Sequence, residues 1–198
     1  MANLHFIYGV MAASKSAQLC MQAYQYKQTG CKYEVIKSAL DNRNGVVDYV
    51  ESRIGLKEKC IALNNLQKFT PKPDTQFVLI DEVQFFSAAD IDKLVEIVDY
   101  NPNITVLCYG LKTDIHGHLW PASQRLLEVD AATYEIKTVC QNPGSGCTNR
   151  ASYNARFKNG LLDINGPIIE IGSAQYISLC RKCYNLYKRI AIEQNERK

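Results

Sequence analysis

The chain has 198 residues, 46% of them hydrophobic, and a formal net charge of +3, which is typical of one globular fold with a small appendage. This charge does not indicate nucleic-acid or anionic-membrane binding, and no apolar run is long enough to span a membrane. There are eight cysteines and no secretory signal pattern. Reduced thiols or metal ligands are therefore indicated, and we expect a cytoplasmic protein.

The first predicted elements are a strand, a tight loop and a helix. Residues 4–8 are apolar and aromatic like a buried strand, and residues 17–27 favour a helix. Between them, residues 9–16 read G-V-M-A-A-S-K-S. This is the context of a phosphate-binding P-loop, whose backbone N–H groups bind phosphate oxygens. Lys15 would contact the β- and γ-phosphates, and Ser16 would offer its hydroxyl to Mg²⁺.

The loop departs from the G-x-x-x-x-G-K-[ST] pattern at Ser14, where glycine is usual. Glycine suits that position because it adopts positive φ and has no Cβ to crowd the ligand. A serine in the left-handed conformation costs about 1–2 kcal/mol, which a fold can absorb. On this motif alone, a surface turn carrying a lysine is the commoner explanation, so the prediction needs a second signal.

The next segment contains short elements and one polar loop. Gly30 is expected to end the first helix, and residues 32–37 alternate like a strand. Residues 38–45 are polar and include Asp41 and Arg43. By itself, this loop is best explained as a turn with a solvated arginine. Three more short elements are predicted: strands over residues 46–50 and 60–63, and a helix over residues 64–69.

The second signal is an apolar strand that ends in two acids. Residues 77–80 read F-V-L-I, and Asp81 and Glu82 follow. In P-loop enzymes the acid at this point holds Mg²⁺ directly or through water, and a second acid can accept a proton from the attacking group. Surface acids at a strand end are common. Paired with the loop at residues 9–16, however, the functional interpretation is the stronger one.

Strands and helices continue to alternate up to residue 139. The expected elements are a helix over residues 87–100 with a capping box at Ser87 and Asp90, a strand over 104–109, a helix over 121–129 with Pro121 at its first position, and a strand over 134–139. This alternation predicts an α/β fold with loops gathered at one edge of the sheet.

The remaining residues have the character of a small cysteine-rich ribbon. Residues 150–157 and 168–171 favour strands, and Asn159 with Gly160 favours a hairpin turn. Two cysteine pairs flank this ribbon: Cys140 with Cys147, and Cys180 with Cys183. The second pair has zinc-knuckle spacing, whereas the first is wider than usual, so four unrelated thiols are the alternative. We predict a Cys₄ zinc site, because the ribbon is too small to hold together unaided. Residues 181–198 form a basic, helix-prone tail.

Together these motifs resemble one family, the zinc-containing thymidine kinases, over nearly the whole chain. The matching segments are residues 6–9 with Lys15 and Ser16, I-K-x-A-x-D-x-R at 36–43, S-R-I-G at 52–55, D-E-V-Q-F-F at 81–86, Y-G-L at 109–111, and Y-x-x-x-C-R-x-C at 176–183. The resemblance implies an α/β P-loop parallel-sheet core and a small zinc-binding β-ribbon, the lasso domain. The expected parts are a nucleotide-binding domain over residues 1–138, the lasso domain over 139–185 and a helical tail over 186–198.

The function that the resemblance implies is ATP-dependent phosphorylation of the thymidine 5′-hydroxyl, with Mg²⁺ and Zn²⁺ as metals. Glu82 would be the general base, with Lys15 and Arg43 as further catalytic residues. The cofactor-binding residues would be Gly9, Val10, Met11, Ala12, Ala13, Ser14, Lys15, Ser16, Asp81 and Gln84. The nucleoside-binding residues would be Asp41, Phe85, Leu111, Ile115, Asn154, Ile169 and Tyr176. The family also implies inhibition by thymidine triphosphate and a homotetramer. From the charge and the absence of a long apolar run, we expect neither nucleic acid nor membrane as a partner.

The sequence departs from the family mainly in the phosphate loop. Val10, Ala12, Ala13 and Ser14 replace more usual residues, and Ile115 stands where a phenylalanine is frequent. Two alternatives therefore stay open beside an active kinase. One is a nucleotide-binding protein of the same fold with impaired phosphoryl transfer, and the other is a P-loop ATPase with a zinc knuckle.

Overall fold

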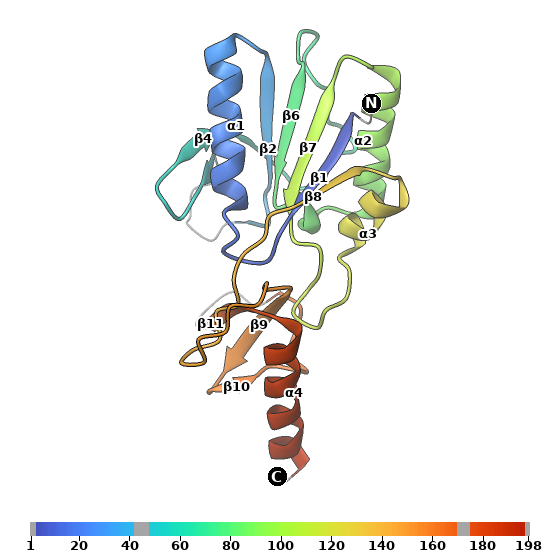
Figure 1. Cartoon of the computed structure of the whole chain (residues 1–198). Helices are drawn as coiled ribbons and strands as arrows, with labels where there is room; N and C mark the ends of the chain where they lie inside the picture. Colours follow the sequence, from blue (N-terminus) through green and yellow to red (C-terminus); the bar gives the residue numbers. More distant parts are fainter. Residues whose placement is uncertain (1–2, 42–47, 170–174, 197–198) are drawn as a thin grey trace. The chain divides into compact units, whose positions relative to one another are not determined.

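The computed structural model describes residues 3–41, 48–169 and 175–196, and its chain divides into two compact units (Figure 1). The first unit comprises Met1–Tyr8, Ser14–Lys112 and Trp120–Ile136. The second comprises Gly9–Ala13, Thr113–Leu119 and Lys137–Lys198. Within the described ranges, no helix combines the length and apolar character that crossing a membrane would require.

A six-stranded sheet in the order β5-β2-β6-β7-β1-β8 forms the centre of the first unit. Its strands are β1 (Leu4–Tyr8), β2 (Tyr33–Ser38), β5 (Ile61–Leu63), β6 (Phe77–Asp81), β7 (Thr105–Gly110) and β8 (Ala132–Glu135). All neighbouring pairs are parallel. The carboxyl ends of these strands therefore meet at one edge, which is where α/β proteins bind their ligands.

Helices cover both faces of this sheet (Figure 1). They are α1 (Lys15–Thr29), α2 (Ala88–Tyr100) and α3 (Pro121–Glu128), and a 3₁₀ turn, η1 (Val83–Phe85), follows β6. Leu19 and Cys20 of α1 pack with one set of strand residues, whereas Leu94 of α2 and Leu126 of α3 pack with the other set. The two faces differ because successive strand side chains point to opposite sides. The core of the first unit thus lies on both sides of the sheet.

Several predicted helix ends are confirmed. Gly30 caps α1 in the left-handed conformation, with φ 74°. Ser87 and Asp90 form the predicted capping box at the start of α2, and Pro121 is the first residue of α3. The ends of a helix leave backbone N–H and C=O groups without partners inside the helix. Gly30 and the capping box supply partners for such groups, and Pro121 has no N–H to satisfy.

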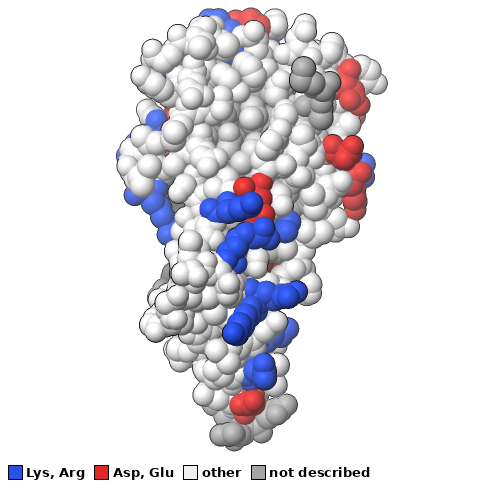
Figure 2. Space-filling model, in the orientation of Figure 1, with Lys and Arg blue, Asp and Glu red and all other residues white. Residues whose placement is uncertain are grey.

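The second unit contains a three-stranded sheet in the order β10-β9-β11 and a helix. The elements are β9 (Tyr153–Lys158), β10 (Leu161–Leu162), β11 (Gln175–Leu179) and α4 (Arg181–Glu196). Asn159 and Gly160 form the predicted turn between β9 and β10, with φ of 51° and 78°. The predicted helical tail is confirmed as α4. Figure 2 shows Lys and Arg side chains on one face of the protein, and α4 carries four exposed ones, Arg181, Lys182, Lys188 and Arg189.

Three local predictions were wrong. Residues 64–69 are not a helix, because the N–H of Leu66 bonds to Asp90 Oδ1 and draws the segment into turns. The strand expected at 134–139 lies earlier, as β8, where it pairs with β1. Residues 168 and 169 of the strand expected at 168–171 are outside any strand, and β9 pairs with β11 instead. Residues 170 and 171 lie outside the described residues. The strand expected at 46–50 is described only from residue 48, and its last residues belong to β3 (Tyr49–Glu51). β3 forms a short hairpin with β4 (Lys57–Lys59), which was not predicted.

The division into units also differs in detail from the expected domains. The last segment of the second unit begins at Lys137, and two earlier segments belong to the same unit. α4 is continuous from Arg181, so it crosses the expected boundary between residues 185 and 186. The boundaries at 138 and 185 stay predictions.

Candidate active site and metal centre

Two buried acids follow one another at the carboxyl end of β6. Asp81 is 3% exposed and Glu82 is 8% exposed. The Ser16 hydroxyl, in the first turn of α1, donates to Asp81 Oδ2 across 3.1 Å. The structure thus brings together the hydroxyl and the acid that the sequence assigned to Mg²⁺. Lys15, the residue before this serine, is also buried within the first unit.

Burial and the neighbouring Glu82 carboxylate raise the pKa of Asp81 to about 7, against the opposing effects of Ser16 and Lys15. Both raising effects disfavour the charged form, because two carboxylates share a site from which water is excluded. A divalent cation would reverse this balance, since its charge is the largest in such a site. An oxygen-rich donor set of this kind fits Mg²⁺.

Glu82 has a left-handed backbone, with φ 52° and ψ 44°. Its carboxylate is oriented by Gln84, whose Nε2 donates to Glu82 Oε2. Gln84 is 1% exposed, and its Oε1 accepts a 2.9 Å hydrogen bond from the N–H of Leu111, just beyond β7. Left-handed conformations of non-glycine residues are strained and cluster at functional sites. The strained backbone of Glu82, and a Gln84 side chain fixed by its bond to Leu111, together indicate that the Glu82 carboxylate is held in one orientation.

Lys37 is a buried member of the site that the sequence analysis missed. Its Nζ lies 3.2 Å from Asp41 Oδ2, and the two residues are 6% and 8% exposed. In the sheet register Lys37 is the partner of Asp81. The available signal was a lysine near the end of an apolar strand at the edge where the acids gather. Arg43, expected beside Asp41, lies outside the described residues.

The phosphate loop runs from one unit into the other. Its first part, Gly9–Ala13, groups with the second unit, and its second part begins at Ser14 in the first unit. Ser14 has φ 60° and ψ 25°, and Ala12 has φ 59°. The position that usually holds glycine is therefore left-handed here too, and its serine makes no side-chain cap to α1.

The residues expected to contact the nucleoside are divided between the units. In the first unit Leu111 is buried, and half-buried Phe85 makes an edge contact with Trp120. In the second unit Ile115 and Asn154 are buried, Tyr176 is half-buried and Ile169 is 50% exposed. The side-chain amide of Asn154 bonds to backbone groups of Met11 and Thr113. Roles in nucleoside binding stay predictions for these six residues and for Asp41.

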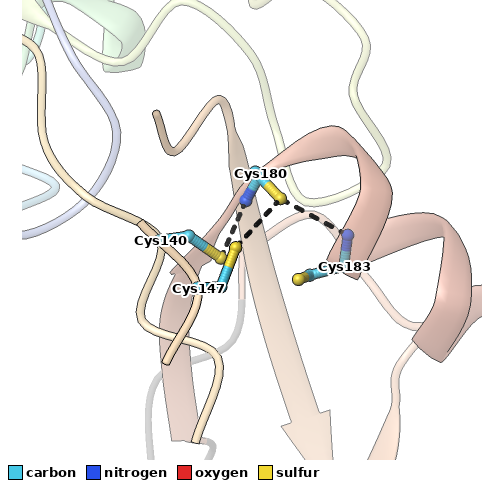
Figure 3. Close-up of side chains that lie close together, drawn as sticks. All are labelled: Cys140, Cys147, Cys180 and Cys183. Atoms are coloured by element: carbon cyan, nitrogen blue, oxygen red, sulfur yellow. Dashed lines mark hydrogen bonds between the residues drawn. The ribbon is translucent and has the colours of Figure 1, made fainter. Parts of the chain in front are cut away.

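The four cysteines of the second unit converge (Figure 3). The sulfur atoms of Cys140, Cys147, Cys180 and Cys183 all lie within 4.8 Å of one another. Cys147 Sγ and Cys180 Sγ are 3.8 Å apart, and none of the four is in a disulfide. Four thiolates around tetrahedral zinc lie about 3.8 Å apart, given a Zn–S bond of about 2.3 Å. The residues present therefore fit Zn²⁺.

The surroundings of this cluster favour a thiolate at Cys180. Burial raises the pKa of this thiol, but hydrogen bonds from the Cys183 N–H and from neighbouring thiols outweigh it and lower the pKa to about 7. Asn142 Nδ2 also donates to Cys183 Sγ across 3.2 Å. At Cys183, however, burial and the three neighbouring thiols outweigh this donor and raise the pKa. The ionised form, which is the form that binds metal, is therefore favoured at Cys180 and not at Cys183.

A parallel α/β sheet, a Lys-Ser pair where α1 begins, and an acid pair at the end of β6 define a P-loop nucleotide-binding protein, here with a cysteine-rich ribbon added. The sequence profile described as thymidine kinase matches residues 2–184. The chain belongs to the thymidine kinase family.

Individual relatives agree over almost their whole lengths. The chain is similar to the thymidine kinase of Enterobacteria phage T4, with 37% identity over 193 residues, covering 93% of this chain and 96% of the relative. It is 35% identical to the thymidine kinase of Streptococcus thermophilus strain CNRZ 1066, covering 92% and 93%. It is also 35% identical to the thymidine kinase of Streptococcus pyogenes serotype M3 strain MGAS315, covering 93% and 97%.

Proposed function

We propose that this protein transfers the γ-phosphoryl group of ATP to the 5′-hydroxyl of thymidine. Membership of the thymidine kinase family supports the reaction. The observation that carries the catalytic assignment is the pair of adjacent acids after β6, of which one bonds to Ser16 and the other is oriented by Gln84. Phosphoryl transfer needs a base for the attacking hydroxyl and a site for Mg²⁺, and two adjacent acids divide these tasks.

In the proposed mechanism Glu82 accepts the proton of the 5′-hydroxyl as the oxygen attacks. Gln84 keeps its carboxylate in one orientation, so that little reorganisation accompanies proton transfer. Asp81 and Ser16 hold Mg²⁺, which neutralises phosphate charge when bound. Lys15 neutralises charge on the β- and γ-phosphates, and the loop N–H groups bind the phosphate oxygens. Lys37 holds Asp41 beside the sugar, and Arg43 acts near the 5′-oxygen.

The second unit is proposed to hold Zn²⁺ through its four cysteines, which would stabilise the ribbon that carries Asn154 and Tyr176. Inhibition by thymidine triphosphate, assembly as a homotetramer and a cytoplasmic location are proposed from the resemblance and the cysteine usage.

The test is transfer of radiolabelled phosphate from ATP to thymidine in the presence of Mg²⁺. Glu82→Gln keeps the size of the side chain but cannot accept a proton, so we expect kcat to fall roughly 10²- to 10⁴-fold with thymidine affinity nearly unchanged. Glu34→Gln is the matched control, because Glu34 is equally buried but lies at the opposite end of β2 from Lys37. Turnover of Glu82→Gln within a few-fold of wild type would reject the assignment of the base.

A further inference from the structure

Two side chains of the β-ribbon bond both backbone groups of one phosphate-loop residue. The N–H of Met11 donates to Asn154 Oδ1 across 2.7 Å. The carbonyl of Met11 accepts from the Ser178 hydroxyl, also across 2.7 Å. All three residues belong to the second unit. We call this arrangement the Met11 clamp.

The geometry of the ribbon explains why these two side chains act together. Asn154 of β9 and Ser178 of β11 are directly opposite in the antiparallel register. The N–H and C=O of Ser178 both bond to Gln141, so its pairing with Asn154 is of the non-hydrogen-bonded kind. In such pairs the side chains of opposed residues lie closest and project from the same face. One face of the ribbon thus presents an acceptor and a donor to the same residue.

Both clamp side chains are shielded from water, with Asn154 2% exposed and Ser178 fully buried. The amide of Asn154 has a second use, because its Nδ2 donates to the Thr113 carbonyl across 3.0 Å. Buried polar groups that are fully hydrogen-bonded rigidify their surroundings, and losing one partner leaves the other with a desolvation penalty. The clamp therefore holds Met11 in one orientation.

Fixing Met11 also fixes the peptide group that follows it. In a planar trans peptide the N–H points to the side opposite the carbonyl. Because the Met11 carbonyl points to Ser178, the N–H of Ala12 points away from that hydroxyl. Ala12 itself is exposed and left-handed, with φ 59°. Phosphate loops bind their ligand through backbone N–H groups, so the orientation of this peptide matters for binding.

We propose that Asn154 and Ser178 are positioning residues for the phosphate loop, and that they orient its N–H groups for ATP through Met11. This inference rests on the proposed function, in which residues 9–16 bind the phosphates of ATP. It gives the ribbon a role toward ATP in addition to its expected role toward the nucleoside.

Ser178→Ala removes the hydroxyl and keeps the backbone. The expected result is a threefold to tenfold rise in KM for ATP, the equivalent of one hydrogen bond, with KM for thymidine changed less than twofold. Thr75→Val is the matched control. The Thr75 hydroxyl is also buried and donates across 2.7 Å, to Glu34, but it lies before β6, at the opposite end of that strand from Asp81. A KM for ATP that rises equally in both variants would overturn the proposal.

A second pair of variants serves if Ser178→Ala does not fold. Ser178→Thr keeps the hydroxyl, whereas Ser178→Val has the shape of the threonine variant with a methyl group in place of the hydroxyl. Both are β-branched residues, which suit a strand. We expect KM for ATP to be severalfold lower in the threonine variant than in the valine variant. Equal values would reject the clamp.

Two further measurements separate this inference from the proposed function. Calorimetric titration with a non-hydrolysable ATP analogue tests the loop directly: no binding to wild type contradicts the proposed function, whereas equal binding to wild type and Ser178→Ala contradicts the clamp. Hydrogen exchange without ligand should show faster exchange in the peptide covering residues 9–13 for Ser178→Ala but not for Thr75→Val. Unchanged exchange in that peptide would also count against the clamp.

Discussion

Ser14 adopts the backbone conformation for which the P-loop pattern normally uses glycine. Its φ of 60° and ψ of 25° lie in the left-handed region, where a Cβ crowds the carbonyl that follows. The fold has absorbed this strain rather than avoided it, because α1 begins at the next residue as the pattern requires. Ser14 is exposed, so replacing its side chain by the hydrogen of glycine would remove no buried contact.

We predict that Ser14→Gly relieves this strain. The free energy of unfolding should rise by about 1 kcal/mol or less, since added flexibility of the unfolded chain offsets part of the gain. kcat/KM for ATP should improve by up to roughly tenfold, and the Kd for thymidine should change little. Steady-state kinetics and urea denaturation measure these effects. Unchanged ATP kinetics would mean that Ala12 and Ala13 already accommodate the serine.

Asp81 makes the apo protein less stable than it could be, because its pKa is raised from 3.8 to about 7. Between the unfolded and the folded pKa, the folded protein binds this proton more tightly than the unfolded chain does. The free energy of unfolding therefore falls as pH rises through this range. We therefore predict that Asp81→Asn raises the Tm in Mg²⁺-free buffer, with a larger difference at about pH 8 than at about pH 5. Scanning fluorimetry across this range measures it, and a difference independent of pH would contradict the prediction. Activity should be lost, because the amide holds Mg²⁺ poorly.

Among the elements, the turn η1 and the end of β7 depend on each other. An added Cβ on Gly110 would lie 2.6 Å from Gln84 Oε1 and 2.7 Å from Val83 Cγ1. Both distances are too short for any real contact, so both groups must give way. One of them is the amide that orients Glu82.

Gly110→Ala should consequently lower kcat roughly 10- to 100-fold, since a misplacement of about 1 Å has effects of this size. Gly30→Ala is the comparison, because it strains the end of α1 without nearby atoms and should lower only the Tm. If the two variants kept equal kcat, Gln84 would not be orienting the base.

The core elements were predictable because their patterns are local. β6 and β7 are continuous apolar runs, and the capping box of α2 lies within four residues. Asp81 and Glu82 were predictable for the same reason, since they directly follow such a run. Residues 64–69 could not be predicted, because Asp90 reorganises that segment from 24 positions away.

Long-range contacts account for what the sequence did not reveal about the site. Gln84 was expected among the cofactor residues, but its contact with Leu111 lies 27 positions away and depends on how β6 and β7 align. Met11 bonds to Asn154 and Ser178, which are 143 and 167 positions away. No periodicity or motif encodes such pairings. They become visible only when the strands are in register.

At the scale of the whole molecule, the second unit has a small core into which the four cysteines are built. Cys140, Cys180 and Cys183 pack with a few residues such as Leu179 and Tyr184. So small a core gives little stability by itself, and a structural metal is a usual remedy.

We predict one zinc ion per chain in the freshly purified, reduced protein. Removing it with a chelator, or Cys183→Ser, should lower the Tm and raise KM for thymidine, because the ribbon carries the expected nucleoside contacts. Cys31→Ser, a partly exposed thiol outside the cluster, is the control. Elemental analysis that finds no zinc would contradict the metal site.

The second unit is assembled from three separate stretches of chain, Gly9–Ala13, Thr113–Leu119 and Lys137–Lys198. A single cut cannot excise it, because truncation near Lys137 would leave the first two stretches behind without Asn154 and Ser178. The same holds for exchange between genes: a ribbon from a distant relative would arrive without the loop residues to which it is fitted. The two units are therefore expected to be inherited together, and chimeras joined near residue 137 should express as poorly folded protein unless both earlier stretches are transplanted as well.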